Sequence, residues 1–188
     1  MLGLQRGTVR LVPHDPRWKH AFTDQQGAIC ARTRLSPARV QHAGSTSVPD
    51  LVAKPILDIV VGATDLESVD DLAGQIVDLG YLDRGWGEGS NGRLLVLESA
   101  PEVRTVHLHI VLYESEHWRH YVAFRDALRS DPALLKQYGD LKRDLAKRFH
   151  DARKSYTSGK EAFILTALSV SGEPMSHGIE CRDERRSP

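Results

Sequence analysis

The 188-residue sequence has little of several features that assign a protein to a class at once. It has no surplus of charge of one sign, because 25 lysine and arginine residues balance 25 aspartate and glutamate residues. Duplex nucleic acid and anionic membranes are bound through a basic surplus, so we expect neither as a main partner. Cysteine is scarce, and Cys30 and Cys181 are far apart with no CxxC pair. This excludes a disulfide framework and a cysteine zinc site, and it predicts free thiols in a reducing cytosol.

Long apolar runs are absent as well. The N-terminal stretch MLGLQRGTVRLVPHD lacks the apolar core of a signal peptide. Nowhere do about 18 consecutive apolar residues occur, so the sequence predicts no membrane span. We therefore expect a cytoplasmic protein without a membrane partner. What is present is a hydrophobic content of 40%, which at this length is enough for one core.

The hydrophobic pattern predicts strands and helices mixed in the first part of the chain and helices alone in the last part. Strands are expected at residues 8–12, 38–42, 56–61, 94–98 and 105–112. Helices are expected over about 16–34 and 66–79, and three more follow residue 115, the last over about 154–170. This order predicts an α+β fold in one domain, residues 1–171, with an α/β core (8–113) and a C-terminal helical layer (114–171). The polar tail, residues 172–188, has no periodicity and is expected to be disordered.

Local signals support several of these boundaries. Asp15 before Pro16 is typical of an N-cap followed by proline at the first helical position. The run 64–67, TDLE, has the pattern of a capping box, and Leu66 begins the apolar face of the helix that follows. Residues 84–93 are expected to form a flexible glycine-rich loop with an Asn-Gly hairpin turn. The G-x-G-x-x-G pattern inside this loop is no dinucleotide fingerprint, because a strand and not a helix follows it.

The most informative polar segment is HAGSTS at residues 42–47, which follows a predicted strand. A Gly-Ser turn can hold phosphate oxygens with backbone N–H groups and hydroxyls, although it can equally be an ordinary turn. Lys54 and Asp58 follow it, and Asp58 is the one charged residue of an apolar strand. A buried carboxylate is costly unless it binds a metal or a cation. This order of groups is the general layout of a metal–triphosphate site.

A pair of histidines stands in the last predicted strand. Alternation along a strand places His107 and His109 on one face, and Val106, Leu108 and Ile110 on the other. The pair could bind a metal or a phosphate, or it could be two histidines hydrogen-bonded beneath the helical layer. A second pair, His117 and His120, is expected on the surface of a helix.

Four polar residues interrupt or flank the apolar faces of the C-terminal helices: Arg125, Lys142, Tyr156 and Lys160. The simpler interpretation is a solvated helix surface. The alternative is that these side chains close over an anionic ligand from above the sheet.

Several segments together resemble the GrpB family. They are HAGSTSVP (42–49), AKPILDI (53–59), VHLHIV (106–111) and FRDALR (124–129), with VPHDPRW (12–18) near the start and Tyr156, Lys160 and Phe163 near the end. The resemblance runs in order over residues 8–170. It implies similarity to the nucleotidyltransferase fold of the DNA polymerase beta superfamily, with a small mixed β-sheet and flanking helices.

In that superfamily a Gly-Ser motif binds nucleotide phosphates, and Asp-x-Asp on the next strand plus a later acid holds two divalent metals. Carried over, the resemblance assigns Gly44 and Ser45 to the Gly-Ser pair and Asp58 to the first Asp. The second Asp is replaced by Val60, and histidines stand where the later acid is expected. Asp50 also departs from the family, which usually has glycine after Val-Pro.

These observations lead to the hypothesis of a nucleotidyltransferase-like enzyme that binds an NTP or another phosphorylated ligand and acts on a small-molecule acceptor. A divalent metal, Mg²⁺ or Mn²⁺ or else Zn²⁺, would be held by Asp58, His107 and His109, which are also the catalytic candidates. The candidate nucleotide- and phosphate-binding residues are His42, Gly44, Ser45, Thr46, Lys54, Arg125, Tyr156 and Lys160. The alternatives are a non-catalytic module that binds a ligand or a partner protein, and a metal-dependent enzyme of different chemistry.

Overall fold

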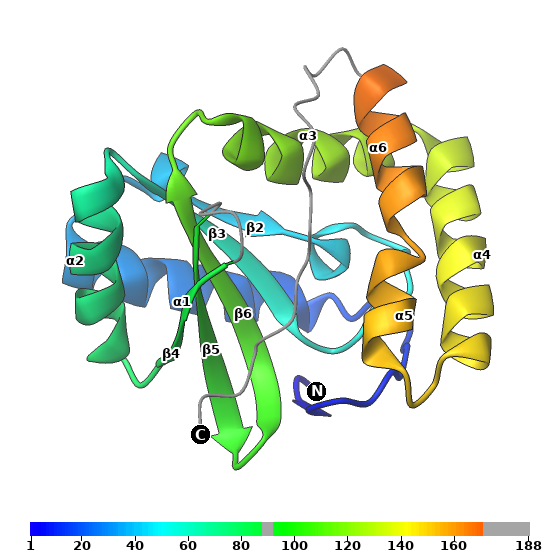
Figure 1. Ribbon diagram of the computed structural model, residues 1–188, viewed down its shortest axis with the longest axis horizontal. Helices are drawn as coiled ribbons and strands as arrows, with labels where there is room; N and C mark the ends of the chain where they lie inside the picture. The colour runs from blue at the N-terminus through cyan, green and yellow to red at the C-terminus, as the bar shows by residue number, and fades with distance from the viewer. Residues whose placement is uncertain (88–91, 171–188) are drawn as a thin grey trace.

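The computed structural model describes residues 1–87 and 92–170 (Figure 1). Within them, six strands form one mixed sheet in the order β2-β3-β6-β5-β4, with β1 pairing with β6. The strands are β1 (Leu4–Gln5), β2 (Val40–Ala43), β3 (Leu57–Ala63), β4 (Leu82–Trp86), β5 (Arg93–Ala100) and β6 (Val103–Leu112). Only β3 and β6 run parallel among these pairs, and the register of that pair sets Asp58 opposite His107.

Helices cover both faces of the sheet (Figure 1). They are α1 (Arg17–Thr33), α2 (Leu66–Val77), α3 (Glu116–Ser130), α4 (Pro132–Arg148), α5 (Arg153–Ser158) and α6 (Glu161–Val170). Helices α1 and α2 pack on the face that carries Ile59 and Leu108, where the largest core lies. Trp118 of α3 packs on the other face, against Val60 and Val111. The predicted mixed sheet with flanking helices and a C-terminal helical layer is confirmed.

The helical layer is anchored to the loop that follows the Gly-Ser turn. Val48 and Leu51 of this loop form a buried cluster with Leu128 of α3 and Tyr138 of α4. Burial of apolar side chains contributes about 25 cal/mol per Å², so a contiguous cluster of this kind fixes the position of the helices over the loop. None of the described helices is long and apolar enough to cross a membrane.

The strand predicted at residues 8–12 is wrong. Val12 makes an isolated bridge with Ala53, and Val9 donates to the carbonyl oxygen of His150 instead of a neighbouring strand. The strand of this region is β1, which pairs with the end of β6. The alternation of apolar residues at 8–12 therefore reflects burial against a loop and the end of a helix, and not pairing with a strand at the edge of the sheet.

Other boundaries need smaller corrections. The capping box of α2 joins Asp65 to Ser68, one residue later than the predicted box of Thr64 and Glu67, and Leu66 is 58% exposed. Part of the predicted glycine-rich loop is the strand β4, while its residues 88–91 and the tail 172–188 lie outside the described residues. The last predicted helix is two helices, α5 and α6, which are separated at Gly159.

Candidate functional site

Asp58 and the Gly-Ser turn meet at the start of β3. Gly44 follows β2, and β2 pairs with β3 so that Ala43 lies opposite Asp58. Gly44 has φ 60 and ψ −170, a conformation that favours glycine. A β-carbon at position 44 would overlap Oδ2 of Asp58 and would lie 2.8 Å from its Cβ. The backbone of the turn thus passes directly over the carboxylate, whose side chain is 33% exposed.

The turn itself is held from the helical layer by two arginines of α3. Arg125 donates through Nη1 to the carbonyl oxygen of His42 at 3.1 Å and to Oε1 of Gln41 at 3.0 Å. Arg129 donates to the carbonyl oxygen of Ser47, with Nη2 at 2.6 Å. Arg125 is 9% exposed, so its expected place on a solvated surface is wrong. The Arg125 side chain binds the backbone that precedes the turn, which makes it a positioning residue rather than a group facing Asp58.

His42 and Thr46 contact each other at the base of the turn. The His42 ring stacks on Phe22 of α1, with ring centroids 4.7 Å apart, and its Nε2 lies 3.0 Å from Oγ1 of Thr46. Burial lowers the pKa of His42 to about 4, with the Asp58 charge opposing the shift. A phosphate contact by His42 or Thr46 stays a prediction, and we leave both out of the ligand set proposed below. Ser45, between Gly44 and Thr46, is half-buried.

The two strand histidines lie on the face predicted for them. Nδ1 of His107 lies 3.5 Å from Oδ1 of Asp58, across the parallel β3–β6 pair. The ring of His109 lies 5.2 Å from that of Tyr121 of α3, under the helical layer. Burial lowers the pKa of both histidines, that of His109 to about 4, against the opposing effect of Asp58. Burial therefore favours the neutral form of both imidazoles.

Two lysines from different segments of the chain lie over the ring of Tyr156, near the Asp58 carboxylate. Nζ of Lys54 lies 5.5 Å from the ring centroid of Tyr156, and Nζ of Lys160 lies 4.8 Å from the same centroid. Tyr156 is 1% exposed, and burial raises the pKa of its hydroxyl, with the Asp58 charge adding to the shift. The structure thus brings Lys54 to Tyr156 and Lys160, which lie about 100 residues further along the chain.

Lys142 is a further lysine of the site, and its expected position on a solvated helix surface is wrong. Lys142 of α4 is 2% exposed and donates to the carbonyl oxygen of Val52, and its Nζ lies 5.3 Å from the Tyr138 ring centroid. Burial and the positive charges of Lys160 and Lys54 lower its pKa well below the usual value, against the opposing effect of Asp58. Its position inside the apolar stripe of α4 was the signal that could have identified it.

The Asp58 carboxyl is the acidic centre of these groups. Burial opposes its ionisation, but the hydrogen bond with His107 and the nearby positive charges outweigh burial, so the pKa of Asp58 lies below its usual range. Within the described residues, no group of three or more His, Cys, Asp or Glu side chains is arranged to hold a metal. Asp58 with His107 can offer at most two ligands, which suits a cation whose other ligands come from a bound phosphate or water.

The expected surface position of one further histidine is also wrong. His120 of α3 is 7% exposed, and its Nε2 lies 3.7 Å from Oε1 of Glu116. His117 is half-buried. Both residues lie on α3, and the side of the helix that carries them is partly or fully covered rather than open to solvent.

Comparison with known proteins gives consistent matches over nearly the whole described chain. A family model described as GrpB protein matches residues 8–169. The glutamate-rich protein GrpB of Alkalihalophilus pseudofirmus is 31% identical over 167 residues, which cover 87% of this chain and 96% of that protein. The crystal structure of the conserved protein GrpB from Enterococcus faecalis superposes with a TM-score of 0.75 at 33% identity, covering 86% of this chain and 96% of that one.

A third similarity is to part of a longer protein. A dephospho-CoA kinase of Mycobacterium bovis is 27% identical over 197 residues, which cover 90% of this chain and 47% of the kinase. A unit of this kind therefore occurs both alone and as about half of a larger chain.

Proposed function

This chain belongs to the GrpB family, and from that membership and the geometry around Asp58 we propose that it binds a nucleoside triphosphate or another phosphorylated ligand. A divalent metal would accompany the ligand, and the bound ligand would react with a small-molecule acceptor. The name of the dephospho-CoA kinase relative is compatible with a phosphorylated ligand, since that chain contains a similar unit.

The observation that carries the proposal is the contact between Gly44 and Asp58. The absence of a side chain at position 44 leaves the backbone of the Gly-Ser turn directly beside a carboxylate. A phosphate that accepts hydrogen bonds from the turn would therefore lie within reach of a cation held by Asp58. This is the relationship that the resemblance to nucleotidyltransferases implies for Gly44, Ser45 and Asp58.

The charge around Asp58 supports an anionic ligand. Lys54 and Lys160 reach the same Tyr156 ring, and both influence buried groups of the site electrostatically. The ammonium groups of both lysines can neutralise the charge of a phosphorylated ligand through charge-assisted hydrogen bonds. Lysines on a buried aromatic ring are also held in place, which lowers the entropy cost of binding.

The chemistry that a divalent cation supplies here is polarisation of a phosphoryl oxygen and neutralisation of the charge on the leaving group. Asp58 would hold it, with His107 as a second ligand or as a base. In a nucleotidyl transfer, an acceptor oxygen bonds to the α-phosphorus while the bond to pyrophosphate breaks. Where His107 is not a ligand, its neutral imidazole accepts the proton of the acceptor hydroxyl.

A second candidate function is a binding module without transfer. Val60 stands on the Asp58 face of β3 where the superfamily pattern has its second Asp, and Val60 is fully buried against Ala43, Val111 and Trp118. An apolar residue at this position removes a ligand of the second metal in a two-metal mechanism. Loss of that ligand favours retained binding over retained transfer.

Isothermal titration calorimetry with ATP, GTP, CTP and UTP, each with Mg²⁺ or Mn²⁺, tests the proposal. We expect metal-dependent binding by the wild type and loss of that binding in Asp58→Asn. Asp71→Asn is the matched control, because Asp71 is an exposed residue of α2. Binding by neither metal–nucleotide combination in the wild type, or equal losses in both variants, would contradict the proposal.

Phosphorus NMR then separates the two candidate functions. Release of pyrophosphate from a bound triphosphate in the presence of small hydroxyl or amine acceptors identifies a transferase. A bound triphosphate that stays intact with every acceptor identifies a binding module.

A further inference from the structure

Helix α3 binds the Gly-Ser turn at both of its ends, and it lies beside β2, where the turn begins (Figure 1). Before the turn, Nη1 of Arg125 donates to the carbonyl oxygen of His42 at 3.1 Å. After the turn, Nε and Nη2 of Arg129 both donate to the carbonyl oxygen of Ser47, at 3.1 Å and 2.6 Å. The two arginines are four residues apart, so they lie on one face of the helix. This face therefore fixes the two carbonyl groups between which the turn stands.

The turn between these two points is also closed on itself. Oγ of Ser47 donates to the carbonyl oxygen of Gly44 at 2.6 Å, and the backbone N–H of Ser47 donates to the same oxygen at 3.3 Å. Because a peptide group is planar, a carbonyl oxygen held in one direction also fixes the direction of the N–H group that follows it. The hydrogen bonds to these carbonyl groups therefore set the direction of the N–H groups that would bind a phosphate under the proposed function.

Asp126 is the acid that orients the two arginines. Its Oδ1 accepts from Nε of Arg125 at 2.7 Å and its Oδ2 accepts from Nη2 at 2.9 Å, which is the paired arrangement of a guanidinium with a carboxylate. Nη1 of Arg129 lies 3.6 Å from Oδ1 of Asp126. Adjacent residues of a helix do not normally face each other, so the pair with Arg125 requires a particular side-chain conformation. In that conformation, Nη1 of Arg125 is directed to the oxygens of Gln41 and His42.

This network runs from solvent to the backbone of the turn. The side chain of Asp126 is 51% exposed, whereas that of Arg125 is 10% exposed. All three nitrogen atoms of the Arg125 guanidinium make hydrogen bonds, two of them with Asp126. A buried guanidinium that loses its carboxylate partner has to move toward water or another acceptor. A change at the exposed Asp126 would therefore be transmitted to the backbone before the turn.

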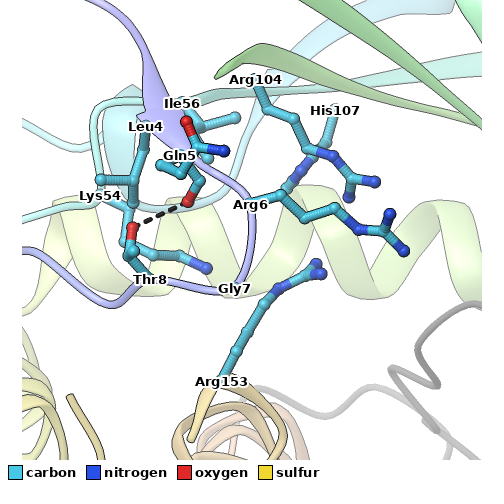
Figure 2. A pocket seen from close by; sticks show the side chains of 10 residues that line it. All are labelled: Leu4, Gln5, Arg6, Gly7, Thr8, Lys54, Ile56, Arg104, His107 and Arg153. Atoms are coloured by element: carbon cyan, nitrogen blue, oxygen red, sulfur yellow. Dashed lines mark hydrogen bonds between the residues drawn. The ribbon is translucent and has the colours of Figure 1, made fainter. Parts of the chain in front are cut away.

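Other elements position the candidate ligand groups on the far side of Asp58. Among the described residues, those that line the pocket beside His107 come from the N-terminal segment, the loop before β3, β6 and α5, and not from the turn or α3 (Figure 2). Lys54 and His107 both lie in the wall of this pocket. A change at Asp126 should therefore alter the turn and leave these two groups in place.

We infer that Asp126 is a positioning residue for ligand binding, which acts through Arg125 and Arg129 to set the Gly-Ser turn in the arrangement that receives a phosphate. The inference rests on the proposed function, because the ligand of the turn is the phosphorylated ligand proposed there. A turn that is already ordered in the free protein loses less freedom on binding, so it binds more tightly. The direct electrostatic effect of Asp126 on an anion is repulsive. The positioning role and the direct effect therefore predict opposite changes when this charge is removed.

Calorimetric titration of Asp126→Asn with ATP, GTP, CTP and UTP, each with Mg²⁺ and at physiological salt, tests the inference. We expect the affinity to fall about three- to tenfold relative to the wild type, although a negative charge has been removed. Asp140→Asn is the matched control, because Asp140 lies on α4, is 53% exposed and pairs with Lys136 and Arg143. The control should change the affinity less than about twofold. Both variants remove exposed ion pairs, so their midpoints of urea unfolding should be alike.

A second variant tests whether Asp126 acts through Arg125. Arg125→Lys keeps the positive charge but cannot form the paired contact with a carboxylate. In the Arg125→Lys background, Asp126→Asn should weaken binding by less than about a further twofold, because the link between the two residues is already broken. The same loss of affinity in both backgrounds would contradict a role exerted through Arg125.

Nitrogen-15 NMR of the ligand-free protein observes the turn directly. The amide resonances of Gly44 and Ser45 should shift in Asp126→Asn and stay in place in Asp140→Asn. Unchanged turn resonances in Asp126→Asn, or an affinity that is unchanged or higher, would overturn the inference and leave the proposed function intact. Absence of nucleotide binding by the wild type would instead contradict the proposed function and, with it, the role of Asp126 in ligand binding.

Discussion

The α-carbon of Gly44 lies against the carboxylate of Asp58. A β-carbon there would lie 2.8 Å from both Cβ and Cγ of Asp58, well inside van der Waals contact, and the φ of 60 favours glycine independently of space. Two separate physical constraints therefore select the same residue at position 44. The result is a stretch of backbone, with no side chain between, beside the acid of the candidate site.

Gly44→Ala should lower the free energy of unfolding by about 2 kcal/mol or more, because strain and overlap act together. Gly74→Ala is the matched control, since Gly74 is an exposed residue of α2 and a β-carbon added there would meet nothing within 4 Å. That change should instead stabilise the protein by about 0.5–1 kcal/mol through helix propensity. Urea unfolding of both variants measures the difference, and two changes of the same sign would contradict the account.

The central part of the site could be predicted because its signals are local. A single charged residue in an apolar strand identified Asp58, and the period of two along β6 placed His107 and His109 on one face. The Gly-Ser turn was recognisable from its residue types. Asp50, where the family usually has glycine, has φ 63, and this left-handed conformation is the physical reason why glycine suits the position.

The groups that surround this centre could not be predicted with the same rules. A lysine or arginine on a helix is a good helix former whether it faces solvent or a buried carbonyl, so its local preference does not reveal its partner. Lys142 reaches the carbonyl oxygen of Val52, 90 residues away, and Arg125 reaches that of His42, 83 residues away. Only the packing of the helical layer on the sheet creates these contacts. The prediction of a strand at 8–12 was wrong for a related reason. Alternation of apolar residues does not show whether a sheet edge is available for the segment to pair with.

The buried lysine predicts an alkaline rise in stability. The pKa of Lys142 in the folded chain lies well below its ordinary value of 10.5, so above that lowered pKa the unfolded chain binds a proton that the folded chain lacks. The free energy of unfolding should therefore increase as the pH rises through the lowered pKa toward 10.5. Lys142→Met should reduce this rise, whereas Lys147→Met, at an exposed position of the same helix, should not. Urea titrations between neutral and alkaline pH measure it, and parallel curves for the two variants would exclude the effect.

The buried His42 predicts a loss of stability at acid pH. Burial first, and nearby arginines after it, lower the pKa of His42 from 6.5 to about 4 against the effect of Asp58. Between these values the unfolded chain binds a proton that the folded chain does not, so stability falls as the pH drops from 6.5 to about 4. The loss attributable to this one group is about 3 kcal/mol. In His42→Leu the free energy of unfolding should fall less between pH 6.5 and about 4 than it does in the wild type. In His20→Leu, which changes an exposed histidine of α1, the fall should equal that of the wild type.

Tyr156 should act on ligand affinity through its ring and not through its hydroxyl. Both Lys54 and Lys160 lie within 5.5 Å of the ring centroid, and each cation–π contact is worth about 0.5–1 kcal/mol. Tyr156→Phe keeps the ring and should leave metal–nucleotide affinity within about threefold of wild type, whereas Tyr156→Leu should weaken it by about five- to thirtyfold. Calorimetry well below the melting temperature, with folding checked by circular dichroism, separates affinity from the packing loss of a residue that is 1% exposed. Equal weakening in both variants would show that the hydroxyl, and not the ring, determines the affinity. Unchanged affinity in Tyr156→Leu would show that the two lysines on the ring do not contact the ligand.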